Sequence, residues 1–385
     1  MQMSNSTPMV LNSLANNPSR ELNWLDLPNH VLLLITDKLI TQIQDYIRFG
    51  AVCKSWRSVY THNLHWYRNH LPLQLPLLML STTDDIKHRS LYSLTENKIY
   101  NYPLAVPHSE NCCSSTQGWL VTVYNGSEVR LLNPCLTVNN VIELPPISAF
   151  EPRGKVTSAV YLNKVVLSAN PTSNSNYIAI AIYSRYCRLA FFKPGNKNWI
   201  SFNTNHELFE DVIYYNDQFH AINYFGEVFT CDVNPSNPVV SKIIERPSVN
   251  PYADKRYLVE SNGGLLQILK TLKNEVGSAR NFLTGEFKVY RLDPVELKWL
   301  ETKNLLGRML FLGRNSSMSL LASDFAGCKP NSIYFTDDYF GGYHMKLQGP
   351  YDMGVFDIED GSLKPHYPTA ISKLSPPPIW ILPRI

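Results

Sequence analysis

Two groups of acidic side chains come closest to a catalytic or ion-binding pattern. Asp337 and Asp338 are adjacent, and Asp357, Glu359 and Asp360 lie within one short stretch. Paired carboxylates can act as general acid and base, and clustered carboxylates can bind calcium. However, the spacing of the second group misses the calcium-loop pattern, and acidic side chains are common in the turns at strand ends. We therefore interpret both groups as turn residues.

Cysteines and histidines are the other side chains that could do chemistry, as metal ligands or redox pairs. The seven cysteines are scattered, and none has the C-x-x-C spacing typical of metal and redox sites. Cys112 and Cys113 are adjacent, but sequence neighbours rarely hold one metal without further ligands, and His108 alone adds little. We expect reduced thiols, no disulfide framework, no metal and no cofactor.

Longer catalytic motifs are absent from the chain. It contains no G-x-S-x-G, H-E-x-x-H, G-x-x-x-x-G-K-[ST] or G-x-G-x-x-G sequence. The 385 residues, 44% hydrophobic and 17% charged, leave room for two or three globular domains. The sequence therefore predicts a non-catalytic protein whose role depends on binding.

The stretch 24–67 carries the clearest helical pattern. Pro28 suits a first helical position, and Leu32, Ile35 and Leu39 recur at spacings of three and four, which predicts an amphipathic helix. Thr41 and Gln44 form a possible capping box for a second helix.

A second apolar stripe follows this capping box. It consists of Phe49, Val52, Trp56 and Tyr60, and Gly50 marks a break between a second and a third short helix. Three helices in about forty residues bury too little surface to be stable alone without a metal, disulfides or a partner. Because only one cysteine, Cys53, lies in the stretch, we expect a partner protein.

These residues resemble the F-box motif in order and in spacing. The resemblance rests on Leu27-Pro28, Val31-Leu32, Ile35, Leu39, Asp45, Arg48-Phe49 and the sequence VCKxWRS from Val52 to Ser58. It implies a helical unit that binds the Skp adaptor of Skp–cullin–F-box ubiquitin ligases. The residues implied to lie at or directly behind the docking surface are Leu27, Pro28, Leu32, Ile35, Leu39, Val52, Cys53 and Trp56.

The same stretch departs from the motif at two positions and leaves one alternative open. His30 stands where the motif usually has an acidic residue, and Gly50 where it often has arginine. A three-helix unit with several basic residues could also bind DNA as a helix-turn-helix. Asp37 and Asp45 interrupt those basic residues, however, and the net charge of the chain is only +3, so we expect neither nucleic acid nor membrane as a partner.

The remaining N-terminal segments show no folded pattern. Residues 1–21 are rich in Ser, Asn and Pro, which predicts a disordered tail, and Pro72 and Pro76 make 68–76 a linker after an F-box at 22–67. The first twenty residues lack the layout of a signal peptide, and no apolar run reaches eighteen residues. We therefore expect the protein in the cytoplasm, the nucleus or both.

From Leu77 onward, short strand-like runs alternate with turn residues, as in all-β proteins. Asn125-Gly126 and Asn216-Asp217 each join two such runs and predict tight hairpins. A strand, a turn and a further strand recur six times with a period near 48, which is typical of propeller blades. A β-sandwich, or two smaller β-domains, is the alternative.

Residues 77–370 resemble the KIB-type β-propeller that follows F-boxes in plant proteins. The resemblance rests on 118–146, on 211–233, and above all on SIYFTDDYF from Ser332 and DMGVFDIEDGSLKP from Asp352. It implies a substrate-recognition domain. The last segment, 371–385, contains three consecutive prolines and is either a polyproline ligand or, as we favour, a segment that packs on the propeller through residues such as Trp380.

The sequence thus predicts an α+β multidomain protein with a small three-helix F-box and an all-β propeller of about six blades. Its expected function is substrate recognition in a Skp–cullin–F-box E3 ubiquitin ligase. The partners would be the Skp adaptor, cullin and RING subunits through it, and a protein substrate that the sequence does not identify. The alternatives are a propeller enzyme of the glycosidase or lyase type, and an F-box scaffold that degrades nothing.

Overall fold

The computed structural model divides the chain into two compact units, Met1–Pro72 and Leu73–Ile385. The described residues are 23–39, 43–70, 73–81, 86–104, 106–136, 139–150, 162–204, 207–234, 236–248, 252–273, 283–338, 352–367 and 378–384.

The first unit contains a short 3-10 helix and three α-helices, which confirms the predicted number of helices. They are η1 (Trp24–Asp26), α1 (Asn29–Leu39), α2 (Ile43–Ala51) and α3 (Lys54–His70). Asn23 begins η1 by accepting a hydrogen bond from the N–H of Leu25 (3.1 Å). Thr41, the first residue of the predicted capping box, lies outside the described residues.

Aromatic side chains from α2 and α3 form the core of this unit. The rings of Tyr46 and Tyr60 lie 4.8 Å apart, and those of Phe49 and Trp56 lie 4.6 Å apart. Gly50 permits this close approach, because a Cβ atom there would lie 2.7 Å from Cγ of Tyr60. Gly50 lies one residue before the end of α2. Its lack of a side chain sets the distance between α2 and α3.

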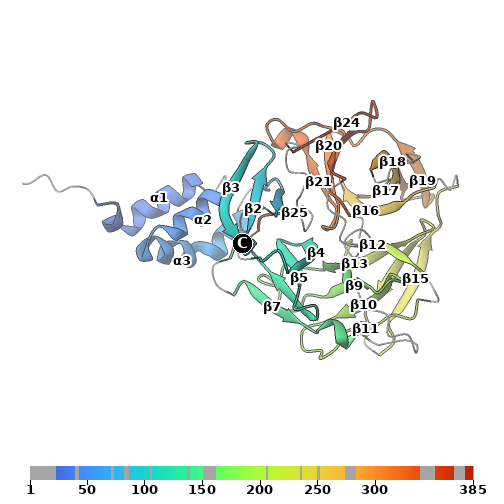
Figure 1. Cartoon of the computed structure of the whole chain (residues 1–385), viewed down its shortest axis with the longest axis horizontal. Helices are drawn as coiled ribbons and strands as arrows, with labels where there is room; N and C mark the ends of the chain where they lie inside the picture. The colour runs from blue at the N-terminus through green and yellow to red at the C-terminus, as the bar shows by residue number, and fades with distance from the viewer. Residues whose placement is uncertain are drawn as a thin grey trace, which may run out of the picture. The chain divides into compact units, whose positions relative to one another are not determined.

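The second unit is a ring of six β-sheets, shown in Figure 1. The second to fifth sheets each have four strands in chain order. These strands are β4 (Asn111–Thr116), β5 (Trp119–Tyr124), β6 (Glu128–Leu132), β7 (Val141–Leu144); β8 (Leu162–Leu167), β9 (Ala179–Tyr183), β10 (Arg188–Phe192), β11 (Ile200–Ser201); β12 (Phe209–Tyr215), β13 (Gln218–Asn223), β14 (Val228–Asp232), β15 (Val239–Ile244); and β16 (Lys255–Ser261), β17 (Gly264–Leu272), β18 (Thr284–Asp293), β19 (Lys298–Thr302). All neighbouring strands in these sheets are antiparallel.

The first and sixth sheets depart from this simple order. The first has the order β25-β1-β2-β3 and the sixth the order β21-β20-β22-β23-β24. Their strands are β1 (Leu77–Leu80), β2 (Arg89–Ser93), β3 (Lys98–Leu104) and β25 (Ile379–Ile381), and β20 (Arg308–Leu312), β21 (Met318–Leu321), β22 (Ser332–Phe335), β23 (Gly354–Asp357) and β24 (Leu363–Lys364). Two 3-10 helices, η2 (Ile147–Ala149) and η3 (Ala322–Asp324), lie in connections. In the sixth sheet, β20 and β22 are parallel.

The inner strands of the sheets follow one another around the ring. Contacts run from β25 to β4, β8, β12, β16 and β21, in that order. The structure is thus a six-bladed propeller, as the repeat predicts, and the sandwich alternative is wrong. Both predicted hairpins are confirmed as β5–β6 and β12–β13. Their turn residues adopt the required left-handed conformation, with φ of 48° at Asn125 and 49° at Asn216.

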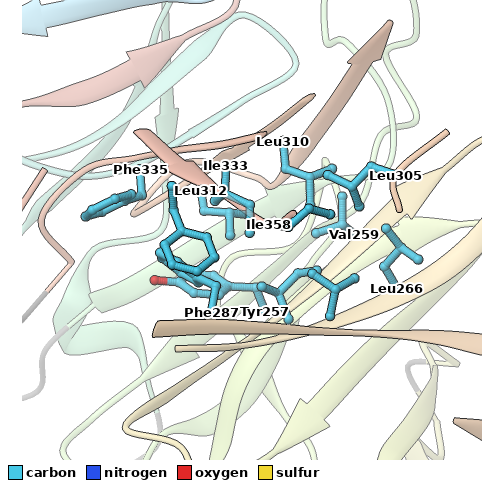
Figure 2. Close-up of a cluster of buried hydrophobic side chains, with 13 residues drawn as sticks. Tyr257, Val259, Leu266, Phe287, Leu305, Leu310, Leu312, Ile333, Phe335 and Ile358 are labelled. Atoms are coloured by element: carbon cyan, nitrogen blue, oxygen red, sulfur yellow. The ribbon is translucent and has the colours of Figure 1, made fainter. Parts of the chain in front are cut away.

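Adjacent blades pack through continuous apolar layers. Figure 2 shows one such layer between the fifth and sixth sheets, where Tyr257, Val259 and Phe287 meet Leu310 and Phe335. Separate apolar clusters likewise lie between the first and second, third and fourth, fourth and fifth, and sixth and first sheets.

Two tryptophans form equivalent hydrogen bonds between neighbouring blades. Trp199 donates its indole N–H to the carbonyl of Pro145 (2.9 Å), and Trp299 donates to the carbonyl of Glu245 (3.1 Å). Each bond spans 54 residues and connects a blade to the end of the preceding one. The repeat visible in the sequence therefore includes a repeated contact between blades.

Candidate functional site

Several large apolar side chains on the helical unit are exposed. Trp24 is 68% exposed, Leu34 64% and Val52 50%. Exposed single apolar residues are common, but a cluster of them on a small unit is typical of an interaction surface.

Two of these residues, Trp24 and Val52, lie beside the start of α3. The indole N–H of Trp56 donates to the carbonyl of Trp24 (3.2 Å), and the hydroxyl of Ser55 donates to the carbonyl of Leu25 (3.4 Å). These bonds hold η1 against the residues that follow Val52. We call Trp24, Leu25, Val52 and Cys53 the junction surface.

The residues implied by the F-box resemblance fall into three classes of burial. Pro28 and Val52 are exposed, and Leu27, Ile35, Leu39 and Cys53 are partly buried. Leu32 is fully buried and Trp56 nearly so, and both belong to the core of the unit. Contact of these eight residues with an adaptor remains a prediction. Because Leu32 and Trp56 are buried, they could contribute only by holding the exposed residues in place.

The helical pattern alone does not identify Trp24, Leu25 and Leu34. Trp24 and Leu25 precede the first α-helix, and Leu34 lies off the apolar stripe of α1. No sequence pattern singles them out, because single exposed apolar residues are common and only the fold shows which of them lie together.

Cys53 lies directly before α3, where its carbonyl accepts the N–H of Arg57 (2.9 Å). Its thiol lies 3.0 Å from the hydroxyl of Ser55. The hydrogen bond with Ser55, together with the backbone N–H of Trp56, lowers the pKa of the Cys53 thiol.

The propeller unit contains a cavity of about 290 Å³ at one end of its ring. Every blade contributes to its lining at the end of its inner strand. Representative lining residues, from the second blade around to the first, are Thr116, Leu167, Tyr214, Glu260, Ser319 and Arg384.

A loop of the sixth blade, residues 313–317, reaches across the ring. The N–H of Ser316 donates to the carbonyl of Ser115 in the second blade (2.7 Å). The hydroxyl of Ser317 donates to Asp211 in the fourth blade (3.4 Å). Gly313 has φ of 153°, and a Cβ atom there would overlap Thr336. This loop therefore links three blades, and its last two residues line the cavity.

Buried ion pairs connect neighbouring blades, from β8 to β12 and from β17 to the residues that follow β22 and precede β23. Lys164 and Asp211 lie 2.5 Å apart, and Lys270 contacts both Asp338 (3.0 Å) and Asp352 (2.7 Å). Burial alone would raise the pKa of Asp338, but Lys270 holds it below its usual value. These charges are paired with each other and have a structural role.

Of the acidic residues interpreted as turn residues, Asp338 instead belongs to this buried ion pair, whereas Asp357 begins a turn. Asp338 also accepts a hydrogen bond from the hydroxyl of Tyr257. Asp357 forms an ion pair with Lys329 and accepts the N–H of Glu359 (2.8 Å), as a turn residue does. Cys112 and Cys113 are buried, and burial raises the pKa of Cys113 to about 12.

The described part of the chain has neither a metal-ligand cluster nor a membrane-spanning helix. Within those residues, no group of three or more metal-ligating side chains could hold a metal ion. Nor is any described helix long and apolar enough to span a membrane.

Comparison with known proteins identifies both units. The KIB1-4 beta-propeller family model matches residues 91–357, and the F-box-like model matches residues 24–72. The chain is 27% identical to the F-box protein SKIP23 of Arabidopsis thaliana, over 94% of this chain and 96% of that protein. It is 24% identical to the F-box protein At2g17036 of the same plant, over 94% and 95%.

The family model covers well over half of the chain, and the relatives match it almost from end to end. The exposed apolar residues lie within the F-box-like match, and the cavity lies in the propeller. The chain therefore belongs to the KIB1-4 β-propeller family and carries an F-box-like region ahead of its propeller.

Proposed function

We propose that this chain is the substrate-recognition subunit of a Skp–cullin–F-box E3 ubiquitin ligase. The helical unit binds a Skp-family adaptor and, through it, the cullin and RING subunits, while the propeller binds a target protein. The order of an F-box-like region and a propeller, shared with relatives named as F-box proteins, supports this assignment.

The observation that carries the proposal is the exposed junction surface. A tryptophan buries about 150–250 Å², so covering Trp24, which is 68% exposed, is worth about 3 kcal/mol at about 25 cal/mol per Å². Val52 and Leu25 add to this area. An adaptor that covers these side chains would gain affinity from a surface that the small unit leaves in water.

The proposed mechanism is proximity. Binding one target and one ligase raises the effective concentration of the target beside the ubiquitin-charged enzyme. No nucleophile of this chain takes part. The role requires the same compartment as the adaptor, so the proposal includes the cytoplasm or nucleus as the location.

The cavity gives little support to the enzyme alternative. Among the described residues that line it, Glu260 is the one carboxylate. Glycoside hydrolysis uses a pair of carboxylates on either side of the bond to be broken. The adaptor role is therefore the better fit to the lining.

The adaptor interaction can be tested by co-purification with a Skp-family adaptor. We expect Val52→Asp to weaken adaptor binding at least tenfold, because it places a charge in an apolar interface; tenfold corresponds to about 1.4 kcal/mol. Val295→Asp is the matched control, since Val295 is 86% exposed and lies in the propeller. Equal recovery of the adaptor with both variants would count against the proposal.

A second pair of changes tests the residues implied by the motif. Replacing Leu27 and Pro28 together by alanine is expected to abolish adaptor recovery while the propeller stays folded, as measured by circular dichroism.

The target itself is to be sought by affinity purification of the full chain with the proteasome inhibited. A target whose lifetime does not change when this chain is deleted would favour the scaffold alternative.

A further inference from the structure

We propose that the cavity of the propeller binds a small monocarboxylic acid with an apolar body, and that Arg384 receives its carboxylate. This site lies wholly in the propeller unit, and the inference does not depend on the ligase assignment. One cation, a set of hydroxyls and an apolar wall surround the same space.

Arg384 is the cation of the cavity lining. Its Nη1 donates to the side-chain oxygen of Gln117 (2.5 Å). Among the described residues, no carboxylate lies within ion-pair distance of its guanidinium. A guanidinium presents several donors in one plane and suits a carboxylate with two parallel hydrogen bonds. Gln117 uses only part of this capacity.

The backbone of Arg384 is held firmly at the cavity. Its carbonyl accepts the side-chain N–H of Asn133 (3.0 Å). Gly118, with φ of 84°, lies so close that a Cβ atom there would be 2.7 Å from Cβ of Arg384. Strand β25, three residues earlier, pairs with β1. The guanidinium is therefore presented by a fixed stretch of chain, which lowers the entropic cost of binding.

Serine hydroxyls supply further hydrogen-bonding groups. Ser316, Ser317 and Ser319 all line the cavity. The Oγ atom of Ser316 is buried and has no hydrogen-bond partner within the described part of the chain. A buried polar atom without a partner is uncommon and costs free energy unless a ligand or water satisfies it.

Apolar side chains form the remaining wall. Val166, Leu167, Ile213 and Leu320 line the cavity, and Val166 and Leu320 are buried. The volume of about 290 Å³ is at the lower end of the range for small-molecule sites. An apolar body of the size of one aromatic ring, with a carboxylate directed to Arg384, would satisfy both parts of the lining.

Glu260 restricts the charge of the ligand. It is the lining carboxylate, and it accepts the N–H of Gly263 (2.8 Å). Its negative charge opposes any anion in the cavity and opposes a dianion more strongly. The site therefore favours a monocarboxylate over a phosphate or a dicarboxylate.

The first experiment compares an acid with its amide on the full chain. Isothermal titration calorimetry with phenylacetate and phenylacetamide keeps the apolar body constant and removes the charge. We expect phenylacetate to bind at least tenfold more tightly. Equal affinity of the pair would overturn the proposal. So would a failure of phenylacetate, benzoate and 4-methylpentanoate alike to bind at about 10 mM.

The second experiment uses two substitutions that each remove one charge. Arg384→Gln should weaken phenylacetate at least tenfold, and Glu260→Gln should strengthen it at least about twofold because a repulsive charge is lost. Arg185→Gln is the matched control, since Arg185 stacks on Tyr186 in an exposed turn outside the cavity. Shifts of equal sign in the two cavity variants, or none in Arg384→Gln, would refute the assignment. The acid–amide comparison stands even if a variant fails to fold.

Discussion

His366 makes the stability of the propeller depend on pH in a way that can be worked out from its surroundings. Its ring lies 5.1 Å from that of Trp380. Its Nε2 donates to the carbonyl of Phe335 (3.0 Å), and its buried Nδ1 has no hydrogen-bond partner in the described residues. Burial lowers the pKa of His366 from 6.5 to about 4. The folded protein therefore holds a neutral imidazole.

The sign follows from the difference between the folded and unfolded states. Above pH 6.5 both states carry neutral histidine, and His366 adds no pH dependence. Below pH 6.5 the unfolded chain takes up a proton that the folded chain refuses, so stability falls as the pH falls. The difference of 2.5 pH units between 6.5 and about 4 corresponds to at most about 3.4 kcal/mol, and about 2 kcal/mol is lost at pH 5.

Glu210 acts in the opposite direction over nearly the same range. Burial raises the pKa of its carboxyl from 4.5 to about 7, although Lys255 and Arg256 partly offset this. The unfolded chain therefore releases this proton first, and stability is lost as the pH rises from 4.5 to about 7. The two effects mask each other in the wild-type protein, so each must be measured through a variant.

The assay is urea unfolding of the full chain between pH 7.5 and pH 5, followed by tryptophan fluorescence. His366→Gln keeps an N–H donor but cannot titrate. We expect the wild type to lose about 2 kcal/mol of stability relative to His366→Gln when the pH falls from 7.5 to 5. Relative to Glu210→Gln, we expect the wild type to gain stability over the same change of pH. Identical pH dependence of the wild type and His366→Gln would refute the reasoning.

Three further predictions concern the packing of the two units. Lys164→Met leaves Asp211 buried without its partner and should cost about 3–5 kcal/mol in unfolding experiments, whereas Lys164→Met with Asp211→Asn should recover most of this. Trp199→Phe removes the indole bond to the preceding blade and should cost about 1–2 kcal/mol, seen as a lower midpoint of thermal unfolding. Gly50→Ala places a methyl group against the ring of Tyr60 and should destabilise the helical unit by about 1–3 kcal/mol, which hydrogen exchange of the amides of α2 and α3 would detect.

Features set by local sequence could be predicted. The hairpin at Asn125-Gly126 requires positive φ, and few residues other than Asn and Gly accept it, so the pattern and the structure agree. The number of blades followed from counting six strand–turn–strand units, although the spacing between them is uneven. The core residues of the helical unit, such as Phe49 and Trp56, followed from helical spacing.

Features set by distant contacts could not be predicted. Strand β20 pairs in parallel with β22, and a parallel pair has no connecting turn that a sequence pattern could reveal. Arg384 meets Gln117 across 267 residues, so the cavity has no local signature. The exposure of Trp24 depends on the packing of η1 beside α3, which helical periodicity does not describe.

The pairing of β25 with β1 means that the first sheet is completed by a segment that lies far along the chain from its other strands. Leu78 lies opposite Trp380, so the first sheet keeps an open edge until Ile379–Ile381 have been synthesised. A product that stops before these residues would expose the strand LLML, an apolar sequence suited to pairing with other chains. Completion of the first sheet therefore requires Ile379–Ile381.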